Sequence, residues 1–298
     1  MFEHKKLISI IILNYNGKEL SKECIDSVLW SDYPNFEIVV IDNASVGNDY
    51  QLLKDIYRGN EKVRIFKSDK QLYFTGGCNL GAKKSRGENL IFLNNDTIVD
   101  KHWIQELIAF THNKEKYLVQ PKILSYWQKN IIDNVGGKYV FPGIGLGAGH
   151  GKKDTNQYNK NKCIDYASGT CFMVNKDFFE ELNSFDKWYK YHYEDVDLSL
   201  RAKKQGGKSW YCCKSIIYHK GSITFKKNVS NKNLIYHIRK NRIRTIIKNF
   251  NGWEKYIRIA CLLLIYIVLS IKELLSLKPA ISFLTIKAAI FALTYHDT

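Results

Sequence analysis

Leu90-Ile-Phe-Leu-Asn-Asn-Asp-Thr97 joins an apolar run directly to a polar one. Its first four residues have the composition of a short strand that is buried on both faces. Asn94, Asn95 and Asp96 follow at once, and these residue types favour turns and carry oxygen atoms that bind ligands. Because open α/β sheets bind their ligands at the carboxyl ends of strands, this stretch predicts a binding site at the tip of a buried strand.

The spacing within this tip indicates a cation site. Asn94 and Asp96 are two residues apart, so in an extended tip their side chains point the same way and can share one hard cation. The alternative is an Asx turn that only connects the strand to the next helix. Asp100 is expected to cap that helix, which would run through Trp103 and Phe110.

Strand and helix patterns alternate on the N-terminal side of this tip. Strands are predicted at residues 7–13, 36–41 and 63–66, and helices at residues 17–30 and 50–57. Another helix opens at Thr75-Gly76-Gly77. Strands that alternate with helices imply right-handed crossovers and a largely parallel sheet. We therefore predict an α/β fold whose strands end in polar or glycine-rich residues.

The middle of the chain is less regular. Strands are predicted at residues 119–124, 166–174, 209–213 and 216–218, with a short helix at residues 176–182. Residues 136–151 are rich in glycine and indicate a flexible loop or a β-ribbon. A phosphate-binding loop is disfavoured there because no helix pattern follows.

A second polar cluster lies between Trp188 and Gly206. Glu194, Asp195 and Asp197 crowd the start of a predicted helix, directly after an aromatic run. Carboxylates at a helix N-terminus are favoured by its dipole, so helix capping explains one of these acids and part of a second. Three acids behind aromatic residues indicate a lined cleft, in which one carboxylate can act as a general base towards a hydroxyl group.

Composition excludes a disordered chain and points to partners that carry negative charge. The chain has 298 residues, 45% of them hydrophobic, and a net charge of +16. Residues 201–258 contain 16 Lys or Arg and one acid, which accounts for +15 of that charge. The seven cysteines show no CxxC spacing, and the first apolar run lacks a signal-peptide cleavage site. These observations predict reduced thiols and a cytosolic setting.

The C-terminal residues 228–298 are predicted to form a helical tail after a domain at residues 1–227. Residues 234–250 have the pattern of a basic amphipathic helix, and the 13 residues 259–271 are uncharged and apolar. That run is shorter than the roughly 20 residues that span a bilayer, and a further apolar run follows Pro279. We expect the tail to lie on an anionic membrane surface, although a hairpin that partly enters the bilayer stays open. Nucleic acid is not expected as a partner, because no stacking aromatics interleave with the basic residues.

Six short motifs occur in order over residues 7–250. They are Ser9-Ile-Ile-Ile-Leu-Asn-Tyr-Asn-Gly17, Val39-Val-Ile-Asp-Asn-Ala-Ser45, Phe74-Thr-Gly-Gly-Cys-Asn-Leu-Gly81, Leu93-Asn-Asn-Asp-Thr97, Tyr193-Glu-Asp-Val-Asp-Leu198 with Arg201, and Tyr218-His-Lys-Gly221. Together they resemble family 2 of the glycosyltransferases, particularly its rhamnosyltransferase-like members. The resemblance implies the GT-A fold, with a nucleotide-binding half and an acceptor-binding half. It also implies transfer of a sugar from a nucleotide donor with inversion at the anomeric carbon.

The resemblance also implies roles for individual residues. The nucleotide-sugar-binding residues would be Asn14, Tyr15 and Asn16 beside the base, Asp42 on the base or ribose, and Gly76, Gly77, Asn79, Asn94 and Asn95. Asp96 would hold Mg²⁺ or Mn²⁺ on the diphosphate, and His219 would complete that metal site. Asp195 would be the catalytic base, with Glu194 beside it in the acceptor pocket.

Two residues depart from the family pattern. Asn94 stands where the acidic metal motif often begins with Asp, which predicts that Asp96 and His219 carry more of the metal binding. Tyr73 stands where many relatives have Gly, which predicts a different donor choice or loop shape.

The resemblance predicts an inverting glycosyltransferase on the cytoplasmic face of a membrane that assembles cell-surface polysaccharide. The acceptor would be a saccharide or a lipid-linked saccharide. The donor would be deoxythymidine-diphosphate-rhamnose, or second a uridine-diphosphate sugar. The main alternative is a non-catalytic nucleotide-sugar-binding or membrane-docked scaffold with the same fold. A dinucleotide-dependent oxidoreductase is disfavoured because no G-x-G-x-x-G turn follows the first strand.

Overall fold

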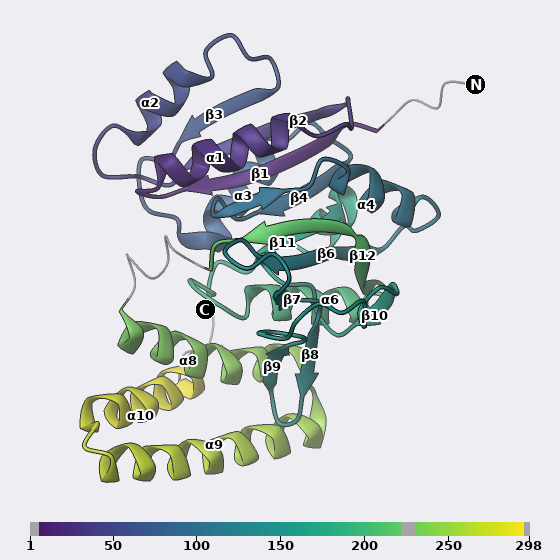
Figure 1. Ribbon diagram of the computed structural model, residues 1–298. Coiled ribbons are helices and arrows are strands. Elements are labelled where there is room, and N and C mark those ends of the chain that lie inside the picture. The colour runs from purple at the N-terminus through teal and green to yellow at the C-terminus, as the bar shows by residue number, and fades with distance from the viewer. Residues whose placement is uncertain (1–5, 222–229, 295–298) are drawn as a thin grey trace.

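A ten-stranded mixed sheet with helices on both faces forms the centre of the computed structural model, which describes residues 6–221 and 230–294 (Figure 1). The first half of the chain forms β1 (Ile8–Asn14), α1 (Lys18–Leu29), β2 (Phe36–Asp42), α2 (Asp49–Ile56), β3 (Val63–Lys67), α3 (Tyr73–Lys84), β4 (Asn89–Leu93), β5 (Thr97–Val99), α4 (Trp103–Thr111), β6 (Tyr117–Ser125), β7 (Ile132–Asn134), β8 (Gly137–Val140) and β9 (Ile144–Gly147). The second half forms β10 (Lys162–Ile164), β11 (Cys171–Asn175), α5 (Lys176–Glu181), α6 (Glu194–Lys204), β12 (Lys208–His219), α8 (Asn231–Asn249), α9 (Gly252–Leu275) and α10 (Pro279–Thr294).

The strand order explains where the functional residues meet. The main path of the sheet is β10-β12-β6-β11-β4-β1-β2-β3, with β5 paired to β12 and β7 paired to β6. Strands β4, β1, β2 and β3 are parallel, so their carboxyl ends share one edge. Strand β11 runs antiparallel between β4 and β6, which makes the sheet mixed. The predicted mostly parallel sheet is therefore confirmed for the N-terminal half.

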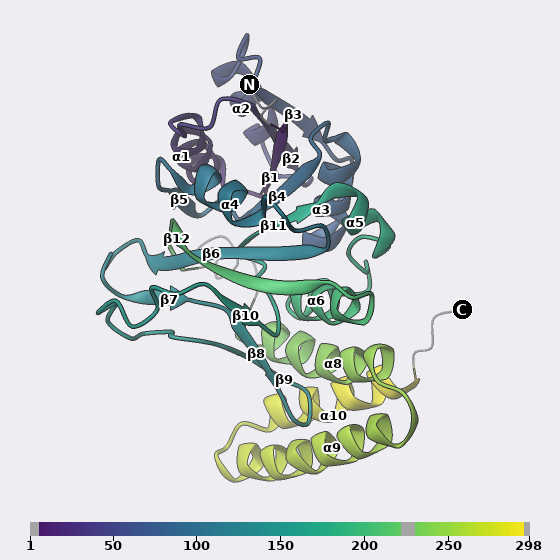
Figure 2. The ribbon, with the colours of Figure 1, turned by 90° about the vertical axis from the view of Figure 1, so that its right-hand side faces the viewer.

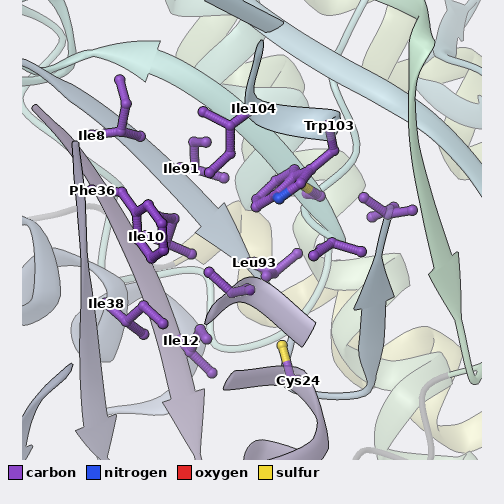
Figure 3. Packing of buried hydrophobic residues seen from close by; sticks show 14 of the residues in the cluster. Ile8, Ile10, Ile12, Cys24, Phe36, Ile38, Ile91, Leu93, Trp103 and Ile104 are labelled. Carbon is purple, nitrogen blue, oxygen red and sulfur yellow. The ribbon is translucent and has the colours of Figure 1, made fainter. Parts of the chain in front are cut away.

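The core lies on both faces of the sheet because the central strands are apolar throughout. Ile8, Ile10 and Ile12 of β1 are buried in one cluster together with side chains of α1 and with Trp103 of α4 (Figure 3). Ile11, between them, points to the opposite face and packs in the cluster that contains α3, α5 and α6. The period of two along an extended strand produces this alternation. Burial of each such side chain contributes about 1.5–3 kcal/mol to folding.

Several strands and one helix have boundaries that differ from those predicted from the sequence. The runs predicted at residues 209–213 and 216–218 form one long strand, β12, with a shift in its pairing to β6 between Cys212 and Ile216. The glycine-rich stretch forms the β8–β9 hairpin, so the β-ribbon alternative is confirmed. Only the second half of the strand predicted at residues 166–174 forms, as β11. Asp100 is not the helix cap, because its carboxylate accepts from the backbone N–H of His102, and α4 begins at Trp103.

The three C-terminal helices pack together below the sheet. Helix α8 lies between α6 and the pair α9 and α10 (Figure 2). Ile243 and Ile246 of α8 are buried against Leu262 and Tyr266 of α9, in a cluster that also includes α10. Within the described residues, no helix combines the length and the apolar character that crossing a bilayer requires.

Helix α8 also contacts the region on the other side of the predicted domain boundary. Asn249 of α8 donates to Asp197 of α6 over 2.8 Å, and Lys248 contacts the same carboxylate. The predicted division between residues 227 and 228 lies outside the described residues and stays a prediction. The contacts of Asn249 and Lys248 show that α8 packs against α6.

Candidate functional site

A cavity of about 320 Å³ opens at the carboxyl ends of β1 and β4, which we call the central cavity. Its lining consists of Ile11, Leu13, Tyr15, Asn43, Gln71, Tyr73, Phe74, Cys78, Leu93, Asn94, Asn95, Asp96, Ser168, Gly169, Thr170, Tyr191, His192, Glu194 and Asp195. Both polar clusters recognised in the sequence, the Asn94–Asp96 tip and the Glu194–Asp195 pair, line this one cavity although about a hundred residues separate them.

The strand tip is fixed by backbone contacts on both sides. The N–H of Asn94 donates to the carbonyl of Thr170 over 3.0 Å, and the hydroxyl of Thr97 donates to the carbonyl of Asn94 over 2.7 Å. Asn95 is buried and donates to the Ser21 hydroxyl over 3.0 Å. The tip is therefore both a turn and part of the cavity wall. The two predictions from the sequence, a binding site and a connecting turn, do not exclude each other.

His219 reaches this tip because β5 and β12 are antiparallel neighbours with His219 opposite Thr97. Its Nε2 lies 3.3 Å from Oδ1 of Asp96, and its Nδ1 donates to Oδ2 of Asp133 over 2.7 Å. Burial alone would lower the pKa of His219, but hydrogen bonds and charges from Asp133 and Asp96 outweigh it and raise the pKa to about 9. The charges of Asp96, Asp133 and His219 therefore stabilise one another.

The donor set at the tip fits a hard divalent cation. A carboxylate on the far ring nitrogen is the usual partner of a metal-binding histidine, and Asp133 occupies that position on His219. Among residues 6–221 and 230–294, no group of three or more His, Cys, Asp or Glu side chains forms a metal cluster. Asp96 and His219 thus form a two-donor site that would need further oxygen ligands, such as those of a diphosphate.

Two adjacent carboxyl groups enter the cavity from the first turn of α6. Oδ2 of Asp195 accepts from the N–H of Gly169 over 2.8 Å, and its Oδ1 accepts from the N–H of Val196 over 2.8 Å. Burial raises the pKa of Asp195, against the effect of these backbone hydrogen bonds. Burial, with the neighbouring Asp195 charge, raises the pKa of Glu194 to about 8. Oε2 of Glu194 is buried with no hydrogen-bond partner among the described residues.

Two predicted nucleotide-binding residues lie beneath the cavity. Asn14 and Asp42 are completely buried neighbours in the β1–β2 pair, and Asn14 donates to Asp42 over 2.8 Å. Neither lines the central cavity, whereas Tyr15 and Asn43, each one residue further along the chain, do. The contacts of Asn14 and Asp42 give them a supporting role, and direct contact of either with a nucleotide stays a prediction.

Asn16 lies outside the cavity lining as well. Its side-chain oxygen accepts from the N–H of Val46 over 2.8 Å, and its own N–H donates to the Ser45 hydroxyl over 3.0 Å. Its backbone is left-handed, with φ of +51°, a region that Asn tolerates better than most residues. Asn16 therefore holds the loop after β2 close to the end of β1.

The three residues of α3 that were predicted near the nucleotide have packing roles in this structure. A Cβ on Gly77 would lie 2.9 Å from Leu13, so a larger residue would push α3 away from β1. Asn79 donates to the carbonyl of Phe185 over 2.8 Å and accepts from its N–H over 3.0 Å. Gly76, Gly77 and Asn79 do not line the cavity, whereas Cys78 on the same helix does. Direct contact of any of these three residues with a nucleotide stays a prediction.

Tyr191 and Asp133 were not predicted as site residues; Tyr191 lines the cavity, as Tyr73 does, whereas Asp133 lies outside its lining. Tyr73 and Tyr191 meet edge to face with ring centroids 5.4 Å apart, and both line the cavity. Tyr73 has φ of +55°, in the region that favours glycine, which agrees with its place at a position where relatives carry Gly. Asp133 belongs to a three-residue strand with no motif around it, so no sequence signal identified it. For Tyr191, the aromatic run before the acids was the available signal.

Comparison with known proteins identifies the family. The model described as "Glycosyl transferase family 2" matches residues 9–183. The O-antigen biosynthesis protein RfbC of Myxococcus xanthus is 28% identical over 210 residues, 67% of this chain and 16% of that protein. The low-salt glycan biosynthesis hexosyltransferase Agl10 of Haloferax volcanii is 25% identical over 203 residues, 66% of this chain and 62% of that protein. The chain thus spans less than two thirds of the length of either relative.

Solved structures share the fold. GalNAc-T7 with UDP, GalNAc and Mn²⁺ superposes with a TM-score of 0.67 at 20% identity, over 82% of this chain and 48% of that one. The mannosyltransferase PcManGT of Pyrobaculum calidifontis, in complex with GDP-Man and Mn²⁺, has a TM-score of 0.61 at 11% identity, over 98% of this chain and 88% of that one. The family match and the shared architecture agree: the chain belongs to glycosyl transferase family 2 and has the GT-A fold.

Proposed function

We propose that this chain is an inverting glycosyltransferase, which moves a sugar from a nucleoside diphosphate to a hydroxyl group of a saccharide or lipid-linked saccharide. The observation that carries the proposal is that Asp96 and Asp195 line the same cavity. Asp96 follows the parallel strand β4, and Asp195 belongs to the first turn of α6, which we assign to the acceptor side. A single displacement needs one group near the leaving phosphate and one base near the attacking hydroxyl.

Asp195 is the proposed base that accepts the proton of the acceptor hydroxyl group. The acceptor oxygen attacks the anomeric carbon while the bond from that carbon to the phosphate oxygen breaks, and the nucleoside diphosphate leaves. The Asp195 carboxylate accepts the hydroxyl proton. The N–H groups of Gly169 and Val196 orient this carboxylate, and burial raises its pKa towards the working range of a base. General-base catalysis of this kind typically contributes about 10²–10⁴-fold.

Asp96 and His219 would hold Mg²⁺ or Mn²⁺ on the donor diphosphate, with His219 oriented by Asp133. When bound, the cation would neutralise charge that develops on the leaving diphosphate. Asn94 and Asn95 line the same part of the cavity and add amide dipoles there. The Mn²⁺ named in the structures of GalNAc-T7 and of PcManGT supports a divalent cation.

Rhamnose from deoxythymidine diphosphate is the proposed donor sugar, with a uridine-diphosphate sugar as the second choice. Rhamnose rests on the rhamnosyltransferase-like motifs of the sequence. Complexes of similar folds contain UDP, UDP-GlcNAc or GDP-Man, and these support a nucleoside diphosphate as the activating group. The relationship to an O-antigen biosynthesis protein supports a role in cell-surface polysaccharide synthesis.

The acceptor is proposed to be lipid-linked because the C-terminal helices α9 and α10 present apolar side chains at the surface. Leu264, Val268, Ile271 and Leu275 follow helical spacing on α9 and are all exposed, Leu264 by 62% and Val268 by 66%. On α10, Phe283, Ile286 and Ile290 repeat the pattern and are also exposed. Exposed apolar side chains at helical spacing are typical of a surface that buries against another one.

The proposed occupant of this face is the interface of an anionic bilayer on its cytoplasmic side. Lys272, Lys278 and Lys287 are exposed on the same two helices or their connection, so an anionic headgroup would meet positive charge beside the apolar side chains. This arrangement would bring the central cavity close to acceptors that are anchored in the membrane.

The configuration of the product tests the mechanism. We expect the anomeric proton of the newly formed linkage, followed by nuclear magnetic resonance early in the reaction, to show the configuration opposite to that of the donor. A product that keeps the donor configuration would contradict the single displacement with Asp195 as its base.

A further inference from the structure

The two carboxyl groups of the cavity follow a backbone turn that is unfavourable for its residues. His192 and Tyr193 have φ of +60° and +73°, both in the left-handed region. Tyr193 is the residue immediately before α6, whose first two residues are Glu194 and Asp195. Non-glycine residues persist in this conformation only where surrounding contacts impose it. The placement of both carboxyl groups therefore depends on whatever holds the turn.

Asn241 of α8 makes the contacts that hold this turn. Its side-chain NH₂ group donates to the carbonyl of Tyr191 over 2.7 Å and to the carbonyl of His192 over 2.7 Å. Asn241 is completely buried. Two short hydrogen bonds from one rigid amide to successive carbonyls restrict the orientation of both peptide groups.

A neighbouring residue of α8 holds the other end of the turn. Nε of Arg242 donates to the hydroxyl of Tyr193 over 2.7 Å, and the N–H of Gly145 in the β8–β9 hairpin donates to the same oxygen over 3.1 Å. The hydroxyl of Tyr189 lies 3.0 Å from that of Thr245, one helical turn after Asn241. Helix α8 thus makes four hydrogen bonds to residues 189–193, through Asn241, Arg242 and Thr245.

We propose that Asn241 is a positioning residue for transfer: by holding the carbonyls of Tyr191 and His192, it fixes the left-handed turn that places Glu194 and Asp195 in the cavity. The proposal rests on the proposed roles of those two carboxyl groups. It assigns to the C-terminal region a part in catalysis that is separate from membrane docking, because α8 lies between α6 and the helices with the exposed apolar face.

Two variants distinguish the hydrogen bonds that the Asn241 side chain donates from the volume that it fills. Asn241→Ala removes both hydrogen bonds, and Asn241→Asp keeps the size but presents only acceptors to the two carbonyls. We expect both to lower kcat by about 100-fold, since small displacements of catalytic groups cost rates of this order. The dissociation constants of UDP and dTDP, measured by calorimetry with Mn²⁺, should change by less than about twofold, because neither nucleotide needs the acids. Asn233→Ala, an exposed position on the same helix, should match the wild type.

Amide hydrogen exchange gives a readout that does not depend on turnover. We expect exchange of residues 189–197 to accelerate at least about tenfold in both Asn241 variants and to stay unchanged in Asn233→Ala. Asn241→Ser, which keeps one donor, provides a graded variant with intermediate effects if Asn241→Ala does not fold. If the wild type transfers no sugar, the proposed function fails, while the exchange data still test the positioning role.

Two results would overturn the positioning role. One is an Asn241→Asp enzyme with wild-type kcat and wild-type exchange, which would show that the site needs only the volume of the side chain. The other is a loss of kcat in Asn241→Ala accompanied by an equal loss of UDP and dTDP binding, which would indicate general misfolding.

Discussion

Glu194 and Asp195 are adjacent carboxyl groups whose partners differ. Asp195 accepts two backbone hydrogen bonds, which favour its ionised form, whereas Oε2 of Glu194 is buried without a partner among the described residues. Burial raises the pKa of Glu194 from 4.5 to about 8, and the Asp195 charge adds to the rise. Near neutral pH Glu194 is therefore a neutral hydrogen-bond donor beside the proposed base, Asp195, whose own pKa burial also raises.

Glu194→Gln should stabilise the protein in a pH-dependent way. Below about pH 4.5 the carboxyl group is protonated in folded and unfolded chains alike, so it gives no pH dependence. Between that pH and about 8 the unfolded chain loses the proton while the folded chain retains it, so the wild type loses stability as the pH rises. We expect the Tm of the variant to exceed that of the wild type by more at pH 8 than at pH 5, as measured by differential scanning calorimetry. An equal difference at both pH values would show that Glu194 ionises normally.

Asp133→Asn should weaken metal binding without removing a ligand. Asp133 orients His219 through Nδ1, and loss of such a partner typically lowers metal affinity or activity about 10–100-fold. When activity is titrated with Mn²⁺, the Mn²⁺ concentration that gives half-maximal activity should rise about 10–100-fold. Saturating Mn²⁺ should restore part of the maximal rate. Asp154→Asn, which affects a carboxylate paired with Lys122, serves as the control. An unchanged Mn²⁺ dependence in Asp133→Asn would remove His219 from the proposed metal site.

At the scale of elements, α9 and α10 bury one face and expose the other. Leu262 and Tyr266 of α9 pack against α8, while Leu264 and Val268 lie exposed on the other face. The buried face of α9 packs against α8, and α8 in turn contacts α6. Removal of the whole tail would therefore also disturb the packing of α6. Substitutions on the exposed face are therefore the cleaner test of the membrane proposal.

Leu264→Glu combined with Val268→Glu should weaken binding to anionic vesicles at least about tenfold. The change removes two exposed apolar side chains and adds two negative charges near anionic headgroups. Val46→Glu combined with Ile56→Glu makes the matched substitution at exposed positions of the catalytic half and should bind vesicles like the wild type. Co-sedimentation with phosphatidylserine vesicles measures both. A wild-type dimer in light scattering that the α9 variant converts to a monomer would instead identify a second copy as the occupant.

The sequence predicted elements wherever local periodicity was strong. The apolar strands β1, β2 and β4 and the polar tip after β4 follow from residues that are adjacent in the chain. Strands β5, β7 and β10 have three residues each, too few for periodicity to detect, and their pairing with distant strands determines them. The tip and the acids were identified as candidates, but Asp133 and Asn241 were not, since their importance arises only from tertiary contacts with His219 and with the Tyr191–His192 turn.

At the scale of the whole molecule, the positive charge and the exposed apolar side chains are both concentrated in the C-terminal third of the chain. The net charge of +16 lies mainly in residues 201–258, which include α8. Helix α8 contacts the turn before Glu194 and Asp195 on one side and the helices with the exposed apolar face on the other (Figure 2). Our account therefore places acceptor delivery, acid positioning and donor binding in successive layers of the molecule.

The most direct test of the central claim is release of nucleoside diphosphate from a panel of nucleotide sugars. The assay would contain Mn²⁺ or Mg²⁺ and membrane extract as the source of acceptor, with Asp195→Asn as the matched variant. Our account predicts release from one donor, loss of release in Asp195→Asn and on addition of chelator, and unchanged nucleotide binding by the variant. Full release by Asp195→Asn would contradict the assignment of the base, and nucleotide binding without release from any donor would favour a non-catalytic scaffold.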